Sequence, residues 1–315
     1  MNRPPKRNSQ AGSRPVSPRT VADPSGVAPP PRQRSGQEGA ASEWPQSDGR
    51  RRDGPRGERD RRDRSRNDRP PADYVLGVHA CMALLTLQPE RVRRVHLWSR
   101  DRALCDTIIA AATAEIVHTP PEGVAGDHLA QGVALDVQPY DHLDLDALCD
   151  RVEPRPGQIL LALDSITDTR NLGAILRAAA FFGVAGAIVP QDRAARVTPV
   201  AERVARGGAS MVPVAQVTNL ARSLGILRDR GWWIVGTALD EDARDLWTLD
   251  PTMAIVLVLG AEDKGLRPLV RRHCDLVVAL SGSPAMQSLN VASFTATALA
   301  ILRRPAAAGE VAGSH

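Results

Sequence analysis

The sequence predicts an α/β protein whose larger part is a parallel sheet with helices on both faces. From residue 159 onward, continuous apolar runs alternate with helical segments, and this alternation is typical of strands buried on both faces. The composition, 43% hydrophobic and 24% charged, is that of an ordinary globular protein. The expected strands are 159–164, 184–189, 232–238, 254–260 and 275–280. The expected helices are 171–182, 198–206, 219–230, 266–273 and 289–302. Ligands of such sheets usually bind at the carboxyl ends of the strands.

A smaller α/β unit precedes this sheet. Helices are expected at 79–87 and 101–113, and strands at 92–98 and 133–137. Pro154 and Pro156 then indicate a linker, because proline disfavours a helix before it and cannot donate to a strand ladder. We therefore expect two folded domains, 74–150 and 157–304.

Residues 1–70 differ from the rest of the chain in composition. They contain 17 Lys and Arg against 9 Asp and Glu, a net charge of +8, so the remaining chain carries −4 of the total of +4. They also contain 11 prolines and few large apolar side chains, which predicts a disordered tail. The arginine-rich run 51–69 fits an arm for RNA phosphates and a solubilising tail equally well.

Several classes of protein are excluded. The sequence has no apolar stretch of about 18 residues to span a membrane and no apolar core of a secretory signal. The four cysteines are far apart without a C-x-x-C pair, which argues against a zinc ribbon or disulfide scaffold and fits reduced thiols in the cytoplasm. Neither G-x-G-x-x-G nor G-x-S-x-G occurs. We therefore expect a cytoplasmic protein without a metal centre.

The stretch LDSITDTRNLGAILRAAAFFG (163–183) carries the first candidate site residues. Asn171 precedes the expected helix and by itself would be an N-cap. Arg177 is the only charged residue between Asn171 and Pro190. A lone arginine usually extends from a helix edge to solvent. The apolar surroundings here favour a functional cation instead.

Two further stretches follow buried strands. In VLVLGAEDKGL (256–266), Gly260 would let the backbone approach a ligand closely, and Glu262 stands at the end of the strand, although a simple turn also fits. The segment 280–302 is uncharged. We expect Ser288 to cap its helix and Asn290 to lie in the first turn. This polar triplet is either a cap only or part of a ligand site.

Together, the three stretches resemble the signature motifs of the SpoU (TrmH-type) branch of SPOUT RNA methyltransferases. The matching segments are DSITDTRNLGAILRAA, VLGAEDKGL and QSLNVA, in the order of the family. VPVAQVTNLARSL (212–224), WWIVGTA (232–238) and YVLGVHACMALL (74–85) resemble bacterial 23S rRNA guanosine-2′-O-methyltransferases in particular. The resemblance covers about 74–302. Pro284, Asp263, Ser210 and Met211 depart from the usual pattern of these relatives.

The resemblance implies a trefoil knot in the C-terminal domain, an RNA-binding N-terminal unit, a homodimer and S-adenosylmethionine as methyl donor. The donor contacts carry over to Gly260, Leu280 and Leu289. The catalytic and substrate positions carry over to Asn171, Arg177, Glu262, Ser288 and Asn290. The implied substrate is RNA rather than DNA, foremost a guanosine ribose of 23S rRNA. No metal is needed, because a neutral thioether leaves. A tRNA ribose methyltransferase and a non-catalytic RNA-binding protein are the alternatives.

Overall fold

The computed structural model describes residues 74–124, 130–240, 243–283 and 288–304. The predicted disordered tail, residues 1–70, lies outside the described residues, and so does Pro284. Within the described ranges, no helix is long and apolar enough to cross a membrane.

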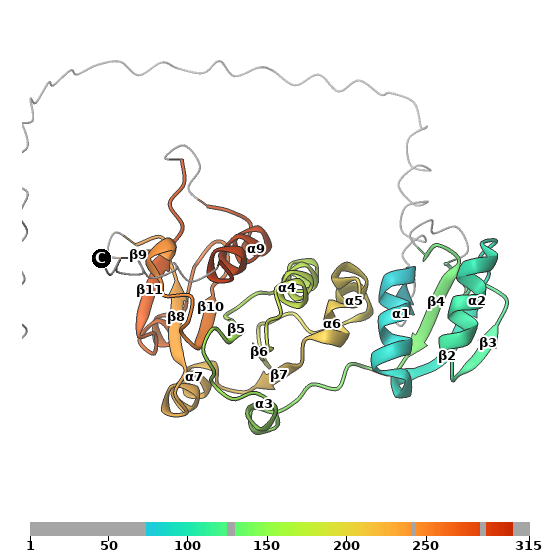
Figure 1. Ribbon diagram of the computed structural model, residues 1–315, viewed down its shortest axis with the longest axis horizontal. Helices are drawn as coiled ribbons and strands as arrows, with labels where there is room; N and C mark the ends of the chain where they lie inside the picture. Colours follow the sequence, from blue (N-terminus) through green and yellow to red (C-terminus); the bar gives the residue numbers. More distant parts are fainter. Residues whose placement is uncertain (1–73, 125–129, 241–242, 284–287, 305–315) are drawn as a thin grey trace, which may run out of the picture. The chain divides into compact units, whose positions relative to one another are not determined.

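The larger part of the described chain is a seven-stranded sheet in the order β7-β6-β5-β10-β8-β11-β9 (Figure 1). Every neighbouring pair is parallel, which confirms the predicted sheet type. The strands are β5 (Ile159–Leu163), β6 (Gly186–Pro190), β7 (Val214–Val217), β8 (Trp233–Thr237), β9 (Arg244–Asp245), β10 (Ile255–Leu259) and β11 (Leu276–Ala279). All five predicted strands are present, and β7 and β9 are additional.

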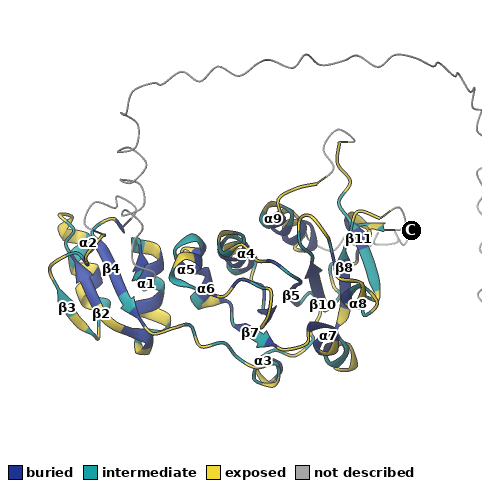
Figure 2. Ribbon diagram, turned by 180° about the vertical axis from the view of Figure 1, so that it is seen from behind, coloured by how far each residue is buried: buried dark blue, intermediate teal, exposed yellow. Residues whose placement is uncertain are grey.

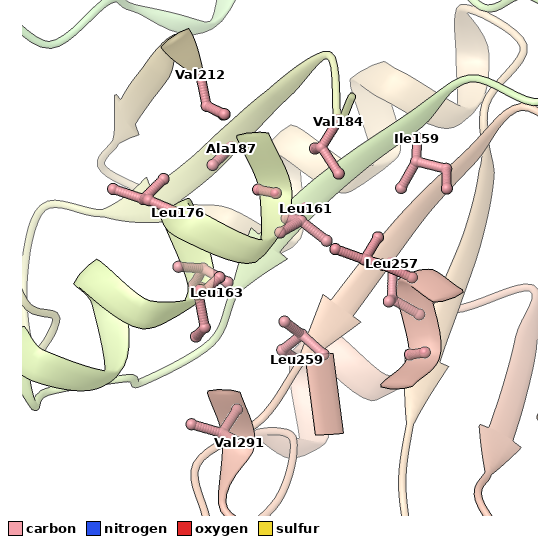
Figure 3. Close-up of a cluster of buried hydrophobic side chains, with 14 of the residues drawn as sticks. Ile159, Leu161, Leu163, Leu176, Val184, Ala187, Val212, Leu257, Leu259 and Val291 are labelled. Carbon is pink, nitrogen blue, oxygen red and sulfur yellow. The ribbon is translucent and has the colours of Figure 1, made fainter. Parts of the chain in front are cut away.

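Helices cover both faces of this sheet. Alternate residues of β5 point to opposite sides: Leu161 and Leu163 pack with Leu257 and Leu259 against α4 and α9 (Figure 3), whereas Leu160 packs toward α3, α7 and α8. The central strands β5 and β10 are buried along their whole length (Figure 2). The helices are α3 (Leu145–Arg151), α4 (Thr169–Phe181), α5 (Pro199–Ala205), α6 (Gly208–Met211), α7 (Leu220–Asp229), α8 (Pro268–Arg271) and α9 (Val291–Leu302).

The end of α9 is fastened to the beginning of the sheet by Arg303. Its guanidinium donates to the carbonyl oxygens of Phe182 at 2.7 Å, Gly157 at 2.9 Å and Gly183 at 2.6 Å. Phe182 and Gly183 follow α4, and α9 packs along α4. Arg303 therefore satisfies loop carbonyls and holds α9 beside α4.

A four-stranded sheet in the order β1-β4-β2-β3 precedes the larger one. It pairs antiparallel except between β2 and β3, and it has its own buried cluster around Val95, Leu135 and Ile108. Its elements are β1 (Tyr74–Leu76), α1 (Val78–Leu87), β2 (Val92–Leu97), α2 (Arg102–Ala111), β3 (Glu115–Val117) and β4 (Val133–Val137). Both predicted strands and both predicted helices of this unit are present. The four cysteines of the chain are free thiols.

A buried ion pair joins the start of β2 to α5. Arg91 Nη1 donates to Glu202 Oε1 at 2.7 Å, and the two residues are only 8% and 3% exposed. The guanidinium also donates to Gln88 Oε1 at 2.7 Å and lies over the ring of Tyr140, 5.1 Å from its centroid. Burial raises the pKa of Glu202 above its ordinary value, while the hydrogen bond and charge of Arg91 act against that rise. The negative charge of the buried Glu202 carboxylate is thus compensated by Arg91.

Candidate active site

A cavity of about 360 Å³ lies where the central strands of the larger sheet end. Its walls come from the segments that follow β8, β10 and β11 and from the start of α9. The predicted donor contacts Gly260, Leu280 and Leu289 all line it, together with Glu262 and Ser288. Ser288 and Leu289 are exposed. The location therefore agrees with the rule that ligands bind at the carboxyl ends of parallel strands.

Gly260 is required by the chain itself. A Cβ at this position would lie 2.4 Å from the carbonyl carbon of Gly265 and 2.6 Å from the nitrogen of Leu266. The loop between them is closed by a hydrogen bond from Gly265 N to Ala261 O at 2.8 Å. Besides making room for a ligand, as expected from the sequence, a glycine at 260 is needed because the following loop approaches its backbone closely.

Asn171, Glu262 and Asn290 form one hydrogen-bonded network. Asn171 Nδ2 donates to Glu262 Oε1 at 3.1 Å, and Asn290 Nδ2 donates to the same oxygen at 2.8 Å and to Asn171 Oδ1 at 3.0 Å. Val291 N, at the start of α9, also donates to Glu262 Oε1 at 3.1 Å. A helix N-terminus favours a carboxylate. One residue of each of the three stretches is thus held at one point.

The helix caps differ from the sequence predictions. Asn290, not Ser288, is the N-cap of α9, and its Oδ1 accepts from Ala292 N at 2.9 Å. The predicted cap at Ser288 is therefore wrong, because α9 begins later than expected. At α4 the cap is Asp168, which accepts from Arg170 N at 2.7 Å. Asn171 lies in the first turn, so its amide is available to Glu262.

Arg177 lies outside this network. It is exposed on α4, about 9 Å beyond Asn171 at 1.5 Å per residue, and it does not line the cavity. Its guanidinium forms no hydrogen bond or ion pair with the rest of the described chain. A Cβ at Gly208 would lie 3.0 Å from Arg177 Cα, so α6 packs closely against the backbone of α4 at this point. The helix is fixed there, while the cation is free for an external anion.

The sequence analysis did not identify several other residues of the site. Asp164 is fully buried at the end of β5 and accepts from Arg267 N at 2.7 Å and Arg267 Nε at 2.5 Å, which holds the segment after the Gly260–Leu266 loop. The segment Thr237–Asp240 lines the cavity because it follows β8, and the strand-end rule applied to β8 would have indicated it. Arg271 and Phe294 also line the cavity, and no motif marks them.

The cavity combines apolar walls with a few charged groups. Large apolar side chains line it on several sides: Leu259, Leu266, Leu280, Leu289, Val291 and Phe294. Its charged groups lie at separate points of the wall: Glu262 is hydrogen-bonded to Asn290, and Asp240 forms an ion pair with Arg271. Such a mixture of apolar walls and a few polar groups is typical of cofactor sites. In the described ranges, no group of three or more His, Cys, Asp or Glu could hold a metal ion.

Comparison with known proteins gives the family. The model of the SpoU rRNA Methylase family matches residues 158–302. A Pseudomonas putida protein named 23S rRNA (guanosine-2′-O-)-methyltransferase RlmB is 40% identical over 239 residues, which cover 71% of this chain and 93% of that protein. The chain belongs to the SpoU rRNA methylase family. The protein is therefore an RNA methyltransferase.

Other SpoU relatives agree with this assignment. The Acinetobacter baylyi protein of the same name is 40% identical over 72% of this chain and 95% of its own length. A Mycobacterium leprae protein named tRNA/rRNA methyltransferase is 39% identical over 65% of this chain and 67% of its own length. The SpoU methyltransferase AviRb from Streptomyces viridochromogenes, solved with AdoMet, has the same fold: its TM-score is 0.62 at 24% identity, covering 78% of this chain and 93% of that one.

Proposed function

We propose that this SpoU protein transfers the methyl group of S-adenosylmethionine to the ribose 2′-hydroxyl of a guanosine in 23S rRNA. The observation that carries the proposal is the Asn171–Glu262–Asn290 network beside a cavity suited to the donor. The names of the Pseudomonas and Acinetobacter relatives support the substrate. Such a substrate implies that the protein works in the cytoplasm.

The chemistry requires an oriented ribose. A 2′-hydroxyl is a poor nucleophile, and it loses its proton as its oxygen attacks the methyl carbon. When bound, S-adenosylmethionine supplies a methyl group on a positively charged sulfur. Glu262 Oε1 is already held by Asn171, Asn290 and Val291 N, so the carboxylate and the two amides can orient the ribose without rearranging. We assign Ser288, exposed at the cavity, to the same ribose-binding group.

Two roles of Arg177 fit its position. It could accept the hydroxyl proton as a base, or hold the neighbouring phosphate and stabilise the developing alkoxide. A guanidinium keeps its charge in proteins, so it is a poor acceptor for the hydroxyl proton. We favour the cationic role, with the proton leaving to solvent water.

Transfer of a labelled methyl group tests the function. Purified protein should label 23S rRNA taken from a strain that lacks the gene, and one guanosine should become resistant to alkaline cleavage at its 3′ side. Labelling of tRNA instead would favour the second candidate, a tRNA ribose methyltransferase; the name of the Mycobacterium relative includes both kinds of RNA. Donor binding without labelling of either RNA would contradict both.

We assign RNA binding to the N-terminal unit, residues 74–150, and catalysis to residues 157–304. The four-stranded sheet with its own core supports a separate unit. Leu148 of α3 packs among the buried side chains of the larger sheet, so the last part of 74–150 would serve as its anchor.

We also infer a trefoil knot and a homodimer. β10 lies between β5 and β8, which both precede it, and α9 later returns to α4, a path that a knot would produce. For the dimer, most apolar residues of 276–280 and 291–302 are covered within the chain, so the support comes from elsewhere: Phe181 is 82% and Met211 59% exposed. Light scattering should give twice the chain mass of 33.8 kDa.

The basic segment 1–70 should supply non-specific attraction to RNA. Each phosphate contact contributes about −0.7 to −0.9 to the log–log slope of affinity against salt. If four or five arginines bind at once, deleting residues 1–70 should flatten that slope by about three to four units. Saturated turnover should not change, because the proposed catalytic residues lie beyond the segment. A salt titration of binding to an rRNA fragment measures this effect.

A full-length variant serves as the control for that deletion. It replaces by glutamine the five arginines in residues 61–70 of that segment: Arg61, Arg62, Arg64, Arg66 and Arg69. Most of the change in slope should be reproduced. Identical slopes for all three proteins would show that the segment only keeps the chain in solution.

A further inference from the structure

The cavity has an ion pair in its wall, away from the three SpoU motifs. Asp240 follows β8, and Arg271 is the last residue of α8. The Asp240 carboxylate and the Arg271 guanidinium form an ion pair, and both residues line the cavity. Their side chains are 43% and 41% exposed, so a ligand can reach both groups.

Folding alone gives little reason for this pair. Ion pairs this exposed contribute little to the stability of a fold. Among the described residues, the other charged ones in the cavity wall are Glu262, Asp263 and Lys264, all in the loop after β10. Glu262 is already engaged by Asn171 and Asn290. Asp240 and Arg271 therefore present the cavity with a carboxylate and a guanidinium side by side.

An α-amino acid end group has the complementary charges. Its carboxylate can accept two parallel hydrogen bonds from the planar guanidinium, and its ammonium can donate to an aspartate. A neutral sugar or base has no such pair of charges. When a zwitterion binds, the guanidinium can pair with its carboxylate and the aspartate with its ammonium group, so every charge keeps an opposite partner.

We propose that Arg271 and Asp240 bind the amino-acid end of the methyl donor, Arg271 its carboxylate and Asp240 its ammonium group. This inference rests on the proposed function, because it takes the cavity as the site of S-adenosylmethionine. The pair then determines specificity: it distinguishes the complete donor and its demethylated product from adenosines that lack the amino-acid part.

Calorimetric binding of two ligands to the full chain, in the presence of a chelator, tests the assignment. S-adenosylhomocysteine carries the amino-acid end, and 5′-methylthioadenosine lacks it. Arg271→Met should weaken S-adenosylhomocysteine by about 10- to 100-fold, the effect expected for lost hydrogen bonds to a charged group. Methylthioadenosine should change by less than about twofold. Arg271→Lys should recover part of the loss, because it keeps the charge without the planar fork.

Arg272→Met is the matched control. Arg272 is the next residue, is exposed and does not line the cavity, so the affinity for neither ligand should change. Equal weakening of both ligands in Arg271→Met would show that Arg271 supports the shape of the cavity, and an unchanged affinity for S-adenosylhomocysteine would show that it makes no contact. Either result overturns the proposal. If the unmodified protein binds neither ligand, the assignment of the cavity fails, which is a separate result.

Discussion

Replacing Arg177 by alanine should lower kcat on rRNA by about 10²- to 10³-fold, the usual loss when a group that stabilises transition-state charge is removed. The affinity for S-adenosylmethionine should stay within about threefold, because Arg177 does not line the cavity. Arg177→Lys should also be poor, since an ammonium lacks the planar fork that holds a phosphate. Single-turnover methylation and calorimetry of the same preparations measure the two effects.

Arg222→Ala is the control for that loss. Arg222 is an exposed arginine on α7, which packs on the face of the sheet opposite to α4. Its replacement therefore removes the same charge away from the proposed catalytic residues. Its kcat should match that of the unmodified enzyme. Near-normal turnover of Arg177→Ala would instead mean that Arg177 is an ordinary arginine at a helix edge that extends into solvent.

Replacing Glu202 by alanine should lower the free energy of unfolding by about 3 to 5 kcal/mol, because it leaves the buried charge of Arg91 without its carboxylate. Gln88 Oε1 and the carbonyl of Gln138 would remain as acceptors, and neither carries a charge. The double variant Arg91→Met with Glu202→Leu should recover most of the loss, because it removes both charges and keeps the volume. Urea unfolding followed by circular dichroism measures the differences.

The exposed pair Arg94–Glu115 provides the control. Its side chains are 47% and 66% exposed, so Glu115→Ala should cost less than about 1 kcal/mol. If Glu202→Ala costs no more than Glu115→Ala, the buried pair does not stabilise the junction between β2 and α5.

The strands in the centre of the sheet could be predicted, and those at its edges could not. β5 and β10 are buried on both faces, so each is a continuous apolar run that the sequence displays directly. β7 has four residues with Gln216 among them, and β9 has only two, Arg244 and Asp245. Such short edge strands exist because a neighbouring strand is there to pair with them, and that pairing is not visible in a local pattern.

The site was predictable only where its residues belong to motifs. Asn171, Glu262 and Asn290 were candidates from their places beside expected strands and helices, and the resemblance gave them their roles. Their mutual hydrogen bonds could not have been derived from positions up to 119 residues apart. The helix caps differ from the predicted Asn171 and Ser288. The side chains of Asp168 and Asn290 accept hydrogen bonds from the first backbone amides of α4 and α9 instead. Arg271 and Asp240 meet only through the folding of β8 and α8.

The hydrogen bonds of Glu262 also set a condition on biosynthesis. Two of its three partners, Asn290 and Val291, belong to the start of α9, the last helix of the described chain. While only β5, α4 and β6 have been made, Asn171 has no complete network to join. The chain therefore acquires this network only after α9 has been made, and a product truncated before Asn290 would lack both the network and a helix that packs in the core.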